Sequence, residues 1–318
     1  MRIESVCILG GTGFVGRHIA NLLGNTRVSI KVLTGRRERN KHLLPIPNLQ
    51  LVEADVHDPD TLVREFRGVD AVINLVGVLN DSPVKGRGFQ SAHVDLPASV
   101  IEACRSTGVG RLLHMSALGA SPDAESRYQQ TKAEGERIVR DAHGEDLAVS
   151  IYRPSVTFGP EDKFLNTFAD LLRIAPIFFV PTPEARFRPV YVTDVARAFT
   201  QSLARRETFG QTFELCGPQT YTLEELVRYC ARVMDLDRTI VGLSDRMSRL
   251  QARILEKVPG KPYSYENYLA SKIDNVCTED GLAALGIHPT ALETVVPRYL
   301  GRTGVRQRYN RFRRLARR

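Results

Sequence analysis

The fold is decided by Val6-Cys7-Ile8-Leu9-Gly10-Gly11-Thr12-Gly13-Phe14-Val15-Gly16. The four apolar residues at the start of this stretch are typical of a short buried strand, and the apolar positions of 15–23 share one face of a helix. Gly10 can adopt the tight turn between them, Gly13 leaves room beside the main chain, and Gly16 allows close packing of helix on strand. Free N–H groups at the start of that helix favour a pyrophosphate. The stretch therefore predicts a dinucleotide-binding turn, and the alternative is a glycine-rich turn without a ligand.

The composition describes an ordinary folded chain that ends in a basic tail. The chain has 318 residues, of which 42% are hydrophobic, and its length suits a nucleotide-binding domain with a smaller lobe. The net charge of +8 equals the eight arginines of 301–318, a segment without acidic residues, so the remaining body is formally neutral. No apolar run is long enough to span a bilayer, and the first strand begins too early for a signal peptide.

The cysteines are few and scattered, at Cys7, Cys104, Cys216, Cys230 and Cys277. No pair has the spacing of a metal site, so no metal site is predicted. Because Cys7 and Cys216 lie in apolar, strand-like runs, we expect buried free thiols. Free thiols favour a reducing, cytoplasmic compartment.

The second predicted strand, 28–33, ends in Thr34-Gly35-Arg36-Arg37. In dinucleotide folds the residue after this strand meets the adenosine ribose, and an acid there favours NAD. Arg36 and Arg37 can instead grip a 2′-phosphate, which favours NADP(H) over NAD(H). The alternative is a solvated basic loop.

Strands and helices alternate through the first half of the chain. Further strands are predicted at 49–54, 71–77, 112–116, 147–152 and 213–216, a long helix at 91–104, and a capping box at 222–225 that opens another helix. This pattern predicts an α/β fold, a Rossmann-type doubly wound parallel sheet with a small C-terminal substrate lobe. The expected divisions are a nucleotide-binding domain at 1–155 with 188–216 returning to it, a smaller lobe at 156–187 and 217–300, and an Arg-rich tail at 301–318.

The glycine spacing and a second motif together resemble the short-chain dehydrogenase/reductase superfamily, on its extended side. The second motif is Tyr128-Gln129-Gln130-Thr131-Lys132, which sets Tyr128 and Lys132 on one helical face. The resemblance implies that Lys132 binds the nicotinamide ribose and that its charge lowers the pKa of Tyr128, so that the phenol exchanges a proton during hydride transfer. The alternative is that Tyr128 only lines the pocket.

The same resemblance implies a set of cofactor contacts. Asp55 would meet the adenine amino group, although it can also serve as a turn former or helix cap. Gly77 would let the chain pass close to the cofactor, and Pro154-Ser155-Val156 would meet the nicotinamide. The full set is Gly10, Thr12, Gly13, Phe14, Val15, Gly16, Arg36, Arg37, Asp55, Val56, Leu75, Val76, Gly77, Lys132, Pro154, Ser155 and Val156.

One catalytic group departs from the superfamily pattern. Active members carry a Ser or Thr one or two residues past the serine of the fifth strand, where this chain has Ala117 and Leu118. Ser116 is the remaining hydroxyl candidate. Loss of a carbonyl-polarising donor can cost orders of magnitude in rate, so the sequence leaves open whether the protein is an enzyme.

Several segments resemble a narrower, atypical group, the NDUFA9-like proteins. They are 74–77, 126–136, 159–169 and 189–196. This group includes the accessory NADPH-binding subunit of respiratory complex I and relatives linked to ubiquinone biosynthesis. The resemblance implies a tightly held NADPH with a structural or redox-sensing role, and complex I subunits or a quinone-biosynthesis complex as partners. The alternative is an active NAD(P)-dependent reductase, or a nucleotide-sugar epimerase/dehydratase, that uses Tyr128 and Lys132.

Two segments combine basic and apolar residues at helical spacing, 246–258 and the tail at 301–318. Such helices suit an anionic membrane surface or an acidic partner. The alternatives are that 246–258 packs on the body as a core helix and that the tail is disordered. No nucleic-acid partner is expected, because no aromatic-rich platform accompanies the arginines. We expect a cytoplasmic protein, peripheral on the inner face of the cytoplasmic membrane through its tail.

Overall fold

Seven parallel strands form the sheet that carries the glycine-rich turn. The structure is a computed structural model that describes residues 1–81, 88–258 and 263–301. The strand order is β11-β6-β5-β4-β1-β2-β3, and every neighbouring pair is parallel. The strands are β1 (Ser5–Leu9), β2 (Ser29–Thr34), β3 (Leu49–Glu53), β4 (Ala71–Asn74), β5 (Arg111–Met115), β6 (Ala148–Pro154) and β11 (Thr212–Leu215).

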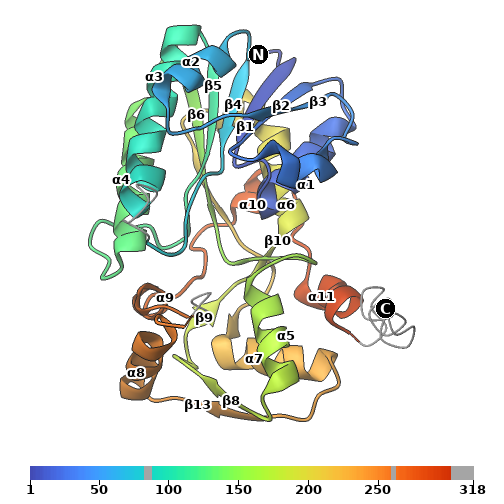
Figure 1. The fold of residues 1–318 in the computed structure, drawn as a ribbon, viewed down its shortest axis with the longest axis vertical. Coiled ribbons are helices and arrows are strands. Elements are labelled where there is room, and N and C mark those ends of the chain that lie inside the picture. Colours follow the sequence, from blue (N-terminus) through green and yellow to red (C-terminus); the bar gives the residue numbers. More distant parts are fainter. Residues whose placement is uncertain (82–87, 259–262, 302–318) are drawn as a thin grey trace. The chain divides into compact units, whose positions relative to one another are not determined.

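Helices cover both faces of this sheet, which confirms the predicted doubly wound fold. Helices α1 and α6 pack together on one face, and α2, α3 and α4 lie on the other (Figure 1). Such burial on both faces explains why β4 is apolar almost throughout. The helices of this part are α1 (Phe14–Gly24), η1 (Arg37–Leu43), α2 (Pro59–Phe66), η3 (Ser91–Asp95), α3 (Leu96–Thr107), α4 (Arg127–Asp141), α6 (Val192–Ser202), η4 (Arg206–Thr208) and α10 (Gly281–Ala284).

The connections diverge between β1 and β4, at the centre of the sheet. Leu9 of β1 pairs with Leu33 of β2 on one side and with Asn74 of β4 on the other. After β1 the chain enters α1, whereas after β4 it leads to α3 on the opposite face. In open α/β sheets this switch point, outside the carboxyl ends of the strands, is where ligands bind.

A buried arginine ties together the far half of the sheet. Arg111 of β5 has no exposed surface, and its guanidinium donates to Ser150 Oγ at 2.7 Å and to Thr208 Oγ1 at 3.0 Å. It also donates to three backbone carbonyls and stacks 4.5 Å from the ring centre of Phe209. Burial lowers the pKa of Arg111 to about 10. Because these partners belong to β6, to the end of α6 and to the region after it, Arg111 has a structural role.

The chain divides into two compact units. Unit 1 is Met1–Pro154, Val192–Leu215 and Thr278–His288, and unit 2 is Ser155–Tyr191, Cys216–Cys277 and Pro289–Arg318. The sequence places 278–288 in the smaller lobe, whereas in the structure α10 packs on β11 of unit 1. The position of this short segment depends on contacts with β11 that its own sequence does not reveal.

Unit 2 has its own apolar core, which lies between α5, α7 and α11. Its buried residues include Leu165, Leu226 and Val296. Its helices are α5 (Phe164–Ile174), α7 (Leu223–Val233), α8 (Asp245–Leu255), α9 (Tyr265–Ala270) and α11 (Leu292–Leu300). Its strands form three two-stranded pairs: β7 (Thr157–Phe158) with β10 (Val190–Tyr191), β8 (Ile177–Val180) with β13 (Thr239–Gly242), and β9 (Arg186–Phe187) with β12 (Tyr221–Thr222).

A disulfide corrects the prediction for two of the five cysteines. Cys216 and Cys277 are joined across 61 residues of chain, while Cys7, Cys104 and Cys230 are free and buried, as expected. The free-thiol prediction is therefore wrong for Cys216 and Cys277, and it no longer supports a reducing compartment. An apolar run reveals burial, but not which distant cysteine lies beside it.

Candidate dinucleotide site

The glycine-rich turn joins β1 to α1 as predicted. The N–H of Gly13 donates to Gly10 O at 2.9 Å and closes the turn. Gly10 has φ of +75°, and a Cβ there would lie 3.1 Å from the carbonyl carbon of Leu75. A Cβ at Gly16 would lie 2.5 Å from Gly10 O. Two of the glycines are therefore required by the packing of the turn itself.

Gly13 differs from Gly10 and Gly16 because it is exposed at the N-cap of α1. A Cβ there would lie 3.1 Å from Gly10 O, a tight contact with one backbone atom, and apart from its chain neighbours no other described residue would come within 4 Å. A glycine cap has no side chain to satisfy the first N–H groups of the helix. These groups and the helix dipole are the features that would favour an anion beside Gly13. Thr12 and Phe14 are half-buried around it, and Val15 is buried.

The end of β4 lies against this turn, so the structure brings Leu75, Val76 and Gly77 to the same edge of the sheet as Gly10. The N–H of Leu75 donates to Leu9 O at 3.0 Å, and that of Val76 to Asn74 Oδ1 at 3.1 Å. A Cβ on Gly77 would lie 3.2 Å from Lys132 Nζ. The lysine of α4 is thereby brought to the switch point.

The predicted adenosine contacts lie after β2 and β3. Arg36 and Arg37 are exposed, and neither guanidinium forms an ion pair with the described part of the chain. The backbone N–H of Arg37 donates to Glu53 Oε2 at 2.8 Å. Asp55 is exposed and its Oδ1 accepts from His57 N–H at 3.0 Å, which is the turn-forming role. Val56 is half-buried against the core of unit 1.

Helix α4 reaches the site because one glycine permits a close approach. A Cβ on Gly135 would clash with the carbonyl oxygen of His93 in the π-helical turn η3, where the sequence predicted a continuous helix. This approach brings Thr131 and Lys132 beside His93. Lys132 is 4% exposed, and its Nζ donates to Met115 O at 3.1 Å. Burial lowers the pKa of Lys132 to about 8, and the charge of Glu136 acts in the opposite direction.

His93 is a site residue that sequence reasoning missed. Its Nδ1 lies 3.0 Å from Thr131 Oγ1, whose one hydrogen is directed at the carbonyls of Arg127 and Tyr128. Nδ1 must therefore donate, which leaves Nε2 to accept from Val78 N–H at 3.1 Å. Burial and the nearby Lys132 charge lower the pKa of His93 to about 3. A neutral His93 therefore fixes the chain that follows β4, a role that no motif indicates.

The predicted catalytic residues lie on neighbouring elements of unit 1. Tyr128 is half-buried, with its ring edge-on to His93, and burial raises its pKa to about 12. The direction is opposite to that expected from the charge of Lys132. Ser116 is buried directly after β5, and its Oγ has no hydrogen-bond partner within the described residues. Ala117 and Leu118 follow it, so the hydroxyl expected there is absent.

The predicted nicotinamide segment crosses from one unit to the other. Pro154 ends β6 in unit 1, whereas Ser155 and Val156 belong to unit 2. There Asn275 Oδ1 accepts from Ser155 Oγ at 2.6 Å and from Val156 N–H at 3.0 Å. Asn275 lies two residues before Cys277, so the disulfide anchors the segment that holds Ser155 and Val156. Sequence reasoning missed Asn275 because it lies about 120 residues from its partners.

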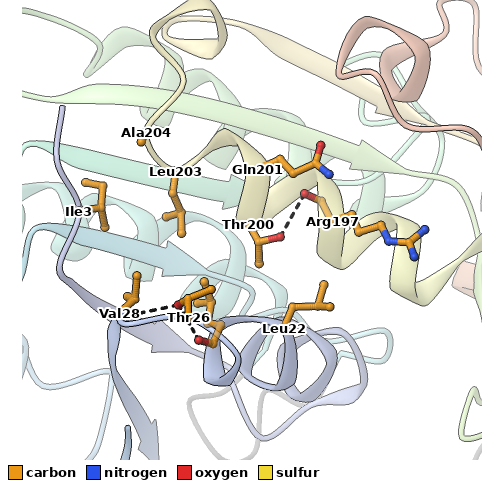
Figure 2. Close-up of a pocket in the computed structure, with 10 residues that line it drawn as sticks. Ile3, Leu22, Thr26, Val28, Arg197, Thr200, Gln201, Leu203 and Ala204 are labelled. Carbon is orange, nitrogen blue, oxygen red and sulfur yellow. Dashed lines mark hydrogen bonds between the residues drawn. The ribbon is translucent and has the colours of Figure 1, made fainter. Parts of the chain in front are cut away.

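A hollow of about 420 Å³ lies elsewhere in unit 1, between α1 and α6, and is open to solvent (Figure 2). Leu22, Thr200 and Leu203 are among its lining residues. None of the predicted catalytic or cofactor residues lines it. The hollow is therefore separate from the predicted catalytic and cofactor residues.

Known proteins match this sequence. The profile of the NAD dependent epimerase/dehydratase family matches residues 6–216. The chain belongs to this family. The mitochondrial 40 kDa subunit of NADH-ubiquinone oxidoreductase from Neurospora crassa is 29% identical over 304 residues, which are 93% of this chain and 79% of that protein. Mitochondrial NADH dehydrogenase (ubiquinone) 1 alpha subcomplex subunit 9 from Rattus norvegicus is 30% identical over 299 residues, 90% and 77% of the two chains.

A solved structure shows the same fold. The NADPH-dependent quinone oxidoreductase QOR2 from Escherichia coli, solved with NADPH, superposes with a TM-score of 0.73 at 19% identity and covers 92% of this chain and 98% of that one. The predicted resemblance to extended short-chain dehydrogenases and to the complex I subunit group is thus confirmed.

The residues present fit the dinucleotide that the family name implies. The N-terminus of α1 is open beside Gly13, and Lys132 Nζ stands beside Gly77. The orphaned, buried Ser116 Oγ provides a further polar atom at the carboxyl end of β5. These groups lie at the carboxyl edge of one sheet and would serve the phosphates, the nicotinamide ribose and the reacting end of a dinucleotide.

Proposed function

We propose that the protein retains NADP(H) as a structural or redox-sensing cofactor and works with the respiratory chain, either with complex I or in ubiquinone metabolism. One observation carries this proposal: the exposed N-terminus of α1 at Gly13 and the buried Lys132 are both present, whereas the hydroxyl that would polarise a substrate carbonyl is absent from 117–118. Burial raises the pKa of Tyr128 to about 12, and Ala117 and Leu118 offer no hydroxyl. A phenol with a raised pKa is a weaker proton donor than an unperturbed tyrosine, so burial does not activate Tyr128 for carbonyl reduction.

Bound NADPH would supply a hydride donor at the carboxyl edge of the sheet. The N–H groups of α1 would hold its pyrophosphate and the ammonium of Lys132 its nicotinamide ribose. His93 would fix the chain at Val78, and Asn275 would fix Ser155 and Val156 within unit 2. In this proposal the residues bind and orient the cofactor more than they promote proton transfer.

The preference for NADP(H) over NAD(H) is part of the proposal and rests on Arg36 and Arg37. Each charge-assisted hydrogen bond to a 2′-phosphate contributes about 1.5–3 kcal/mol, so the loss of one from each arginine in Arg36→Ala with Arg37→Ala should weaken NADPH binding by about a hundredfold or more. NADH binding should not change. The matched control is Arg67→Ala, because Arg67 is an exposed arginine directly after α2. Unchanged NADPH affinity in the double variant would show that the preference has another source.

A second function is favoured by the orphaned Ser116 Oγ and by Tyr128 and Lys132 on one helix. It is an NAD(P)-dependent reductase or a nucleotide-sugar epimerase/dehydratase. Tyr128→Phe discriminates the two proposals. It should abolish substrate-dependent NADPH oxidation by a working reductase, and it should leave NADPH retention unchanged in either case. Wild-type protein that oxidises no NADPH with ketone, quinone or nucleotide-sugar substrates favours the retained cofactor.

The proposed partners are subunits of complex I or of a quinone-biosynthesis complex. The two mitochondrial relatives support the first of these. We further propose a peripheral position on the inner face of the cytoplasmic membrane. Within the described residues, no helix has the length and apolar character needed to cross a bilayer. The predicted tail contact lies at 302–318, outside the described residues. Tagged full-length protein recovered from its host should carry complex I or quinone-pathway proteins, and recovery without either would contradict this assignment.

A further inference from the structure

The exposed apolar side chains of the protein are concentrated in unit 2. Of the thirteen large hydrophobic residues that are exposed in the described chain, nine lie within 171–179 and 241–258. Scattered single residues of this kind are normal on a protein surface, but a concentration of them marks an interaction site. These nine belong to α5, β8, β13, α8 and the residue Val258 shortly after α8.

Helix α8 is turned the opposite way from an ordinary surface helix. Its buried positions are the small residues Ser248 and Ala252, whereas Met247, Leu250 and Ile254 are 50%, 50% and 57% exposed. A surface helix normally turns its apolar stripe to the core. The alternative that 246–258 packs on the body as a core helix is therefore wrong, and its apolar stripe faces outward.

Specific contacts hold α8 in this orientation. Ser248 Oγ accepts from Thr182 N–H at 2.9 Å, and Asp245 Oδ1 accepts from the hydroxyl of Tyr268 in α9 at 2.6 Å. The guanidinium of Arg253 lies 5.5 Å from the ring centre of Tyr265. The small inner face is thus fixed to the segment after β8 and to α9, so the outward stripe is a consequence of packing.

The β8–β13 pair extends the apolar stripe. Ile177 and Phe179 alternate with buried neighbours along β8, and Val241 is paired with Phe179 on β13, so all three are exposed. Gln251 of α8 donates to Phe179 O at 3.3 Å, and Figure 1 draws α8, β8 and β13 next to one another. We define the docking face by Ile177, Phe179, Val241, Met247, Leu250 and Ile254.

Positive charge borders the docking face. Arg246, Arg253 and Lys257 fall on one flank of the apolar stripe at helical spacing, and all three are exposed. No acidic residue occurs between Arg246 and Leu255. An apolar stripe beside basic residues matches an interface whose interior is apolar and whose surface is anionic. We propose that the docking face seats unit 2 on an anionic lipid membrane, with α8 lying in the plane of the interface.

This proposal is independent of the cofactor site and of the tail. The most direct probe uses the absence of tryptophan from the sequence. Leu250→Trp creates a single indole on the docking face, and Leu44→Trp creates one at an exposed apolar residue of unit 1. With phosphatidylcholine vesicles that contain phosphatidylglycerol, the fluorescence of Leu250→Trp should shift to the blue and that of Leu44→Trp should not. Equal shifts, or none for Leu250→Trp, would overturn the proposal.

Vesicle sedimentation of the full-length protein tests the two components separately. Leu250→Gln with Ile254→Gln should reduce partition into the anionic vesicles about tenfold or more, since each removes an apolar side chain from the interface. Arg246→Glu with Lys257→Glu should reduce it at least fivefold per residue at low salt, and Arg67→Glu should have little effect. Partition should also fall as salt rises.

Three outcomes would refute the proposal that the docking face binds an anionic membrane. Strong binding that both α8 double variants retain would assign the contact to another segment. Equal binding to vesicles of phosphatidylcholine alone would remove the role of anionic lipid. A concentration-dependent dimer in sedimentation velocity that Leu250→Gln dissociates, without vesicle binding, would make a second copy of the chain the occupant.

Discussion

Replacing Lys132 by methionine should stabilise the unliganded protein at neutral pH. Lys132 is almost fully buried on α4, its Nζ donates to Met115 O, and burial lowers its pKa to about 8 from 10.5. A buried lysine with a lowered pKa destabilises the fold wherever it is charged. Such a residue is retained for a function, which here would be to hold the ribose of a cofactor.

The size of the effect follows from proton linkage. Below pH about 8 the folded and unfolded chains both carry the proton, and the cost of burying the charge is fully present. From about 8 to 10.5 the unfolded chain binds the proton and the folded chain does not, so stability rises with pH. The pKa difference corresponds to roughly 3 kcal/mol of unfolding free energy. The hydrogen bond to Met115 contributes about 1 kcal/mol, which leaves Lys132→Met roughly 2 kcal/mol more stable than wild type near pH 7.

Urea unfolding followed by circular dichroism at pH 7 and pH 10 tests this reasoning. The difference in unfolding free energy between Lys132→Met and wild type should shrink as pH rises. Other titrating groups affect both proteins equally, so they do not contribute to this difference. Lys132→Arg keeps the charge and is the matched control, and it should give no stabilisation at pH 7. A methionine variant that is less stable than wild type by the same amount at both pH values would refute the account of the buried charge.

Three other changes test separate parts of the structure. Gly16→Ala should destabilise the fold by about 1–3 kcal/mol because its Cβ would lie 2.5 Å from the turn backbone, whereas Gly13→Ala, with a single contact at 3.1 Å, should lower the melting temperature less and weaken NADPH binding in a fluorescence titration; the reverse pattern would contradict phosphate binding at the Gly10–Gly16 turn. Reduction of Cys216–Cys277 should lower the unfolding free energy by up to about 4 kcal/mol for its 61-residue separation, and alkylation of the unreduced, unfolded chain should label three cysteines and not five. Arg111→Ala should cost about 3 kcal/mol or more in urea unfolding, because its hydrogen-bond acceptors would remain buried and unpaired, and a loss below about 1 kcal/mol would contradict its structural role.

Local sequence signals predicted most of the sheet and the elements around the site. The glycine-rich turn lies between β1 and α1, and the capping box at Thr222 and Glu225 opens α7 as expected. The spacing of Tyr128 and Lys132 places both on α4. These features depend on a few neighbouring residues, so the chain encodes them locally.

Features made by distant residues could not be predicted in the same way. The disulfide, the Asn275 contacts with Ser155 and the packing of 278–288 on β11 all join segments far apart in sequence. The pKa of Tyr128 was expected to fall through the charge of Lys132, but burial raises it. The sequence motif shows that the charge of Lys132 lies near Tyr128. It does not show how deeply Tyr128 is buried, because burial depends on the whole surrounding structure.

The central claim is that the turn from Gly10 to Gly16 retains NADP(H), and the nucleotide content of the purified protein tests it most directly. The protein should be isolated in its full length, denatured, and the released nucleotide identified by mass and fluorescence. We expect NADPH or NADP⁺ at close to one per chain, which carbonyl or quinone substrates do not consume. Protein that carries no dinucleotide, and binds none when NADPH or NADH is added, would contradict the account.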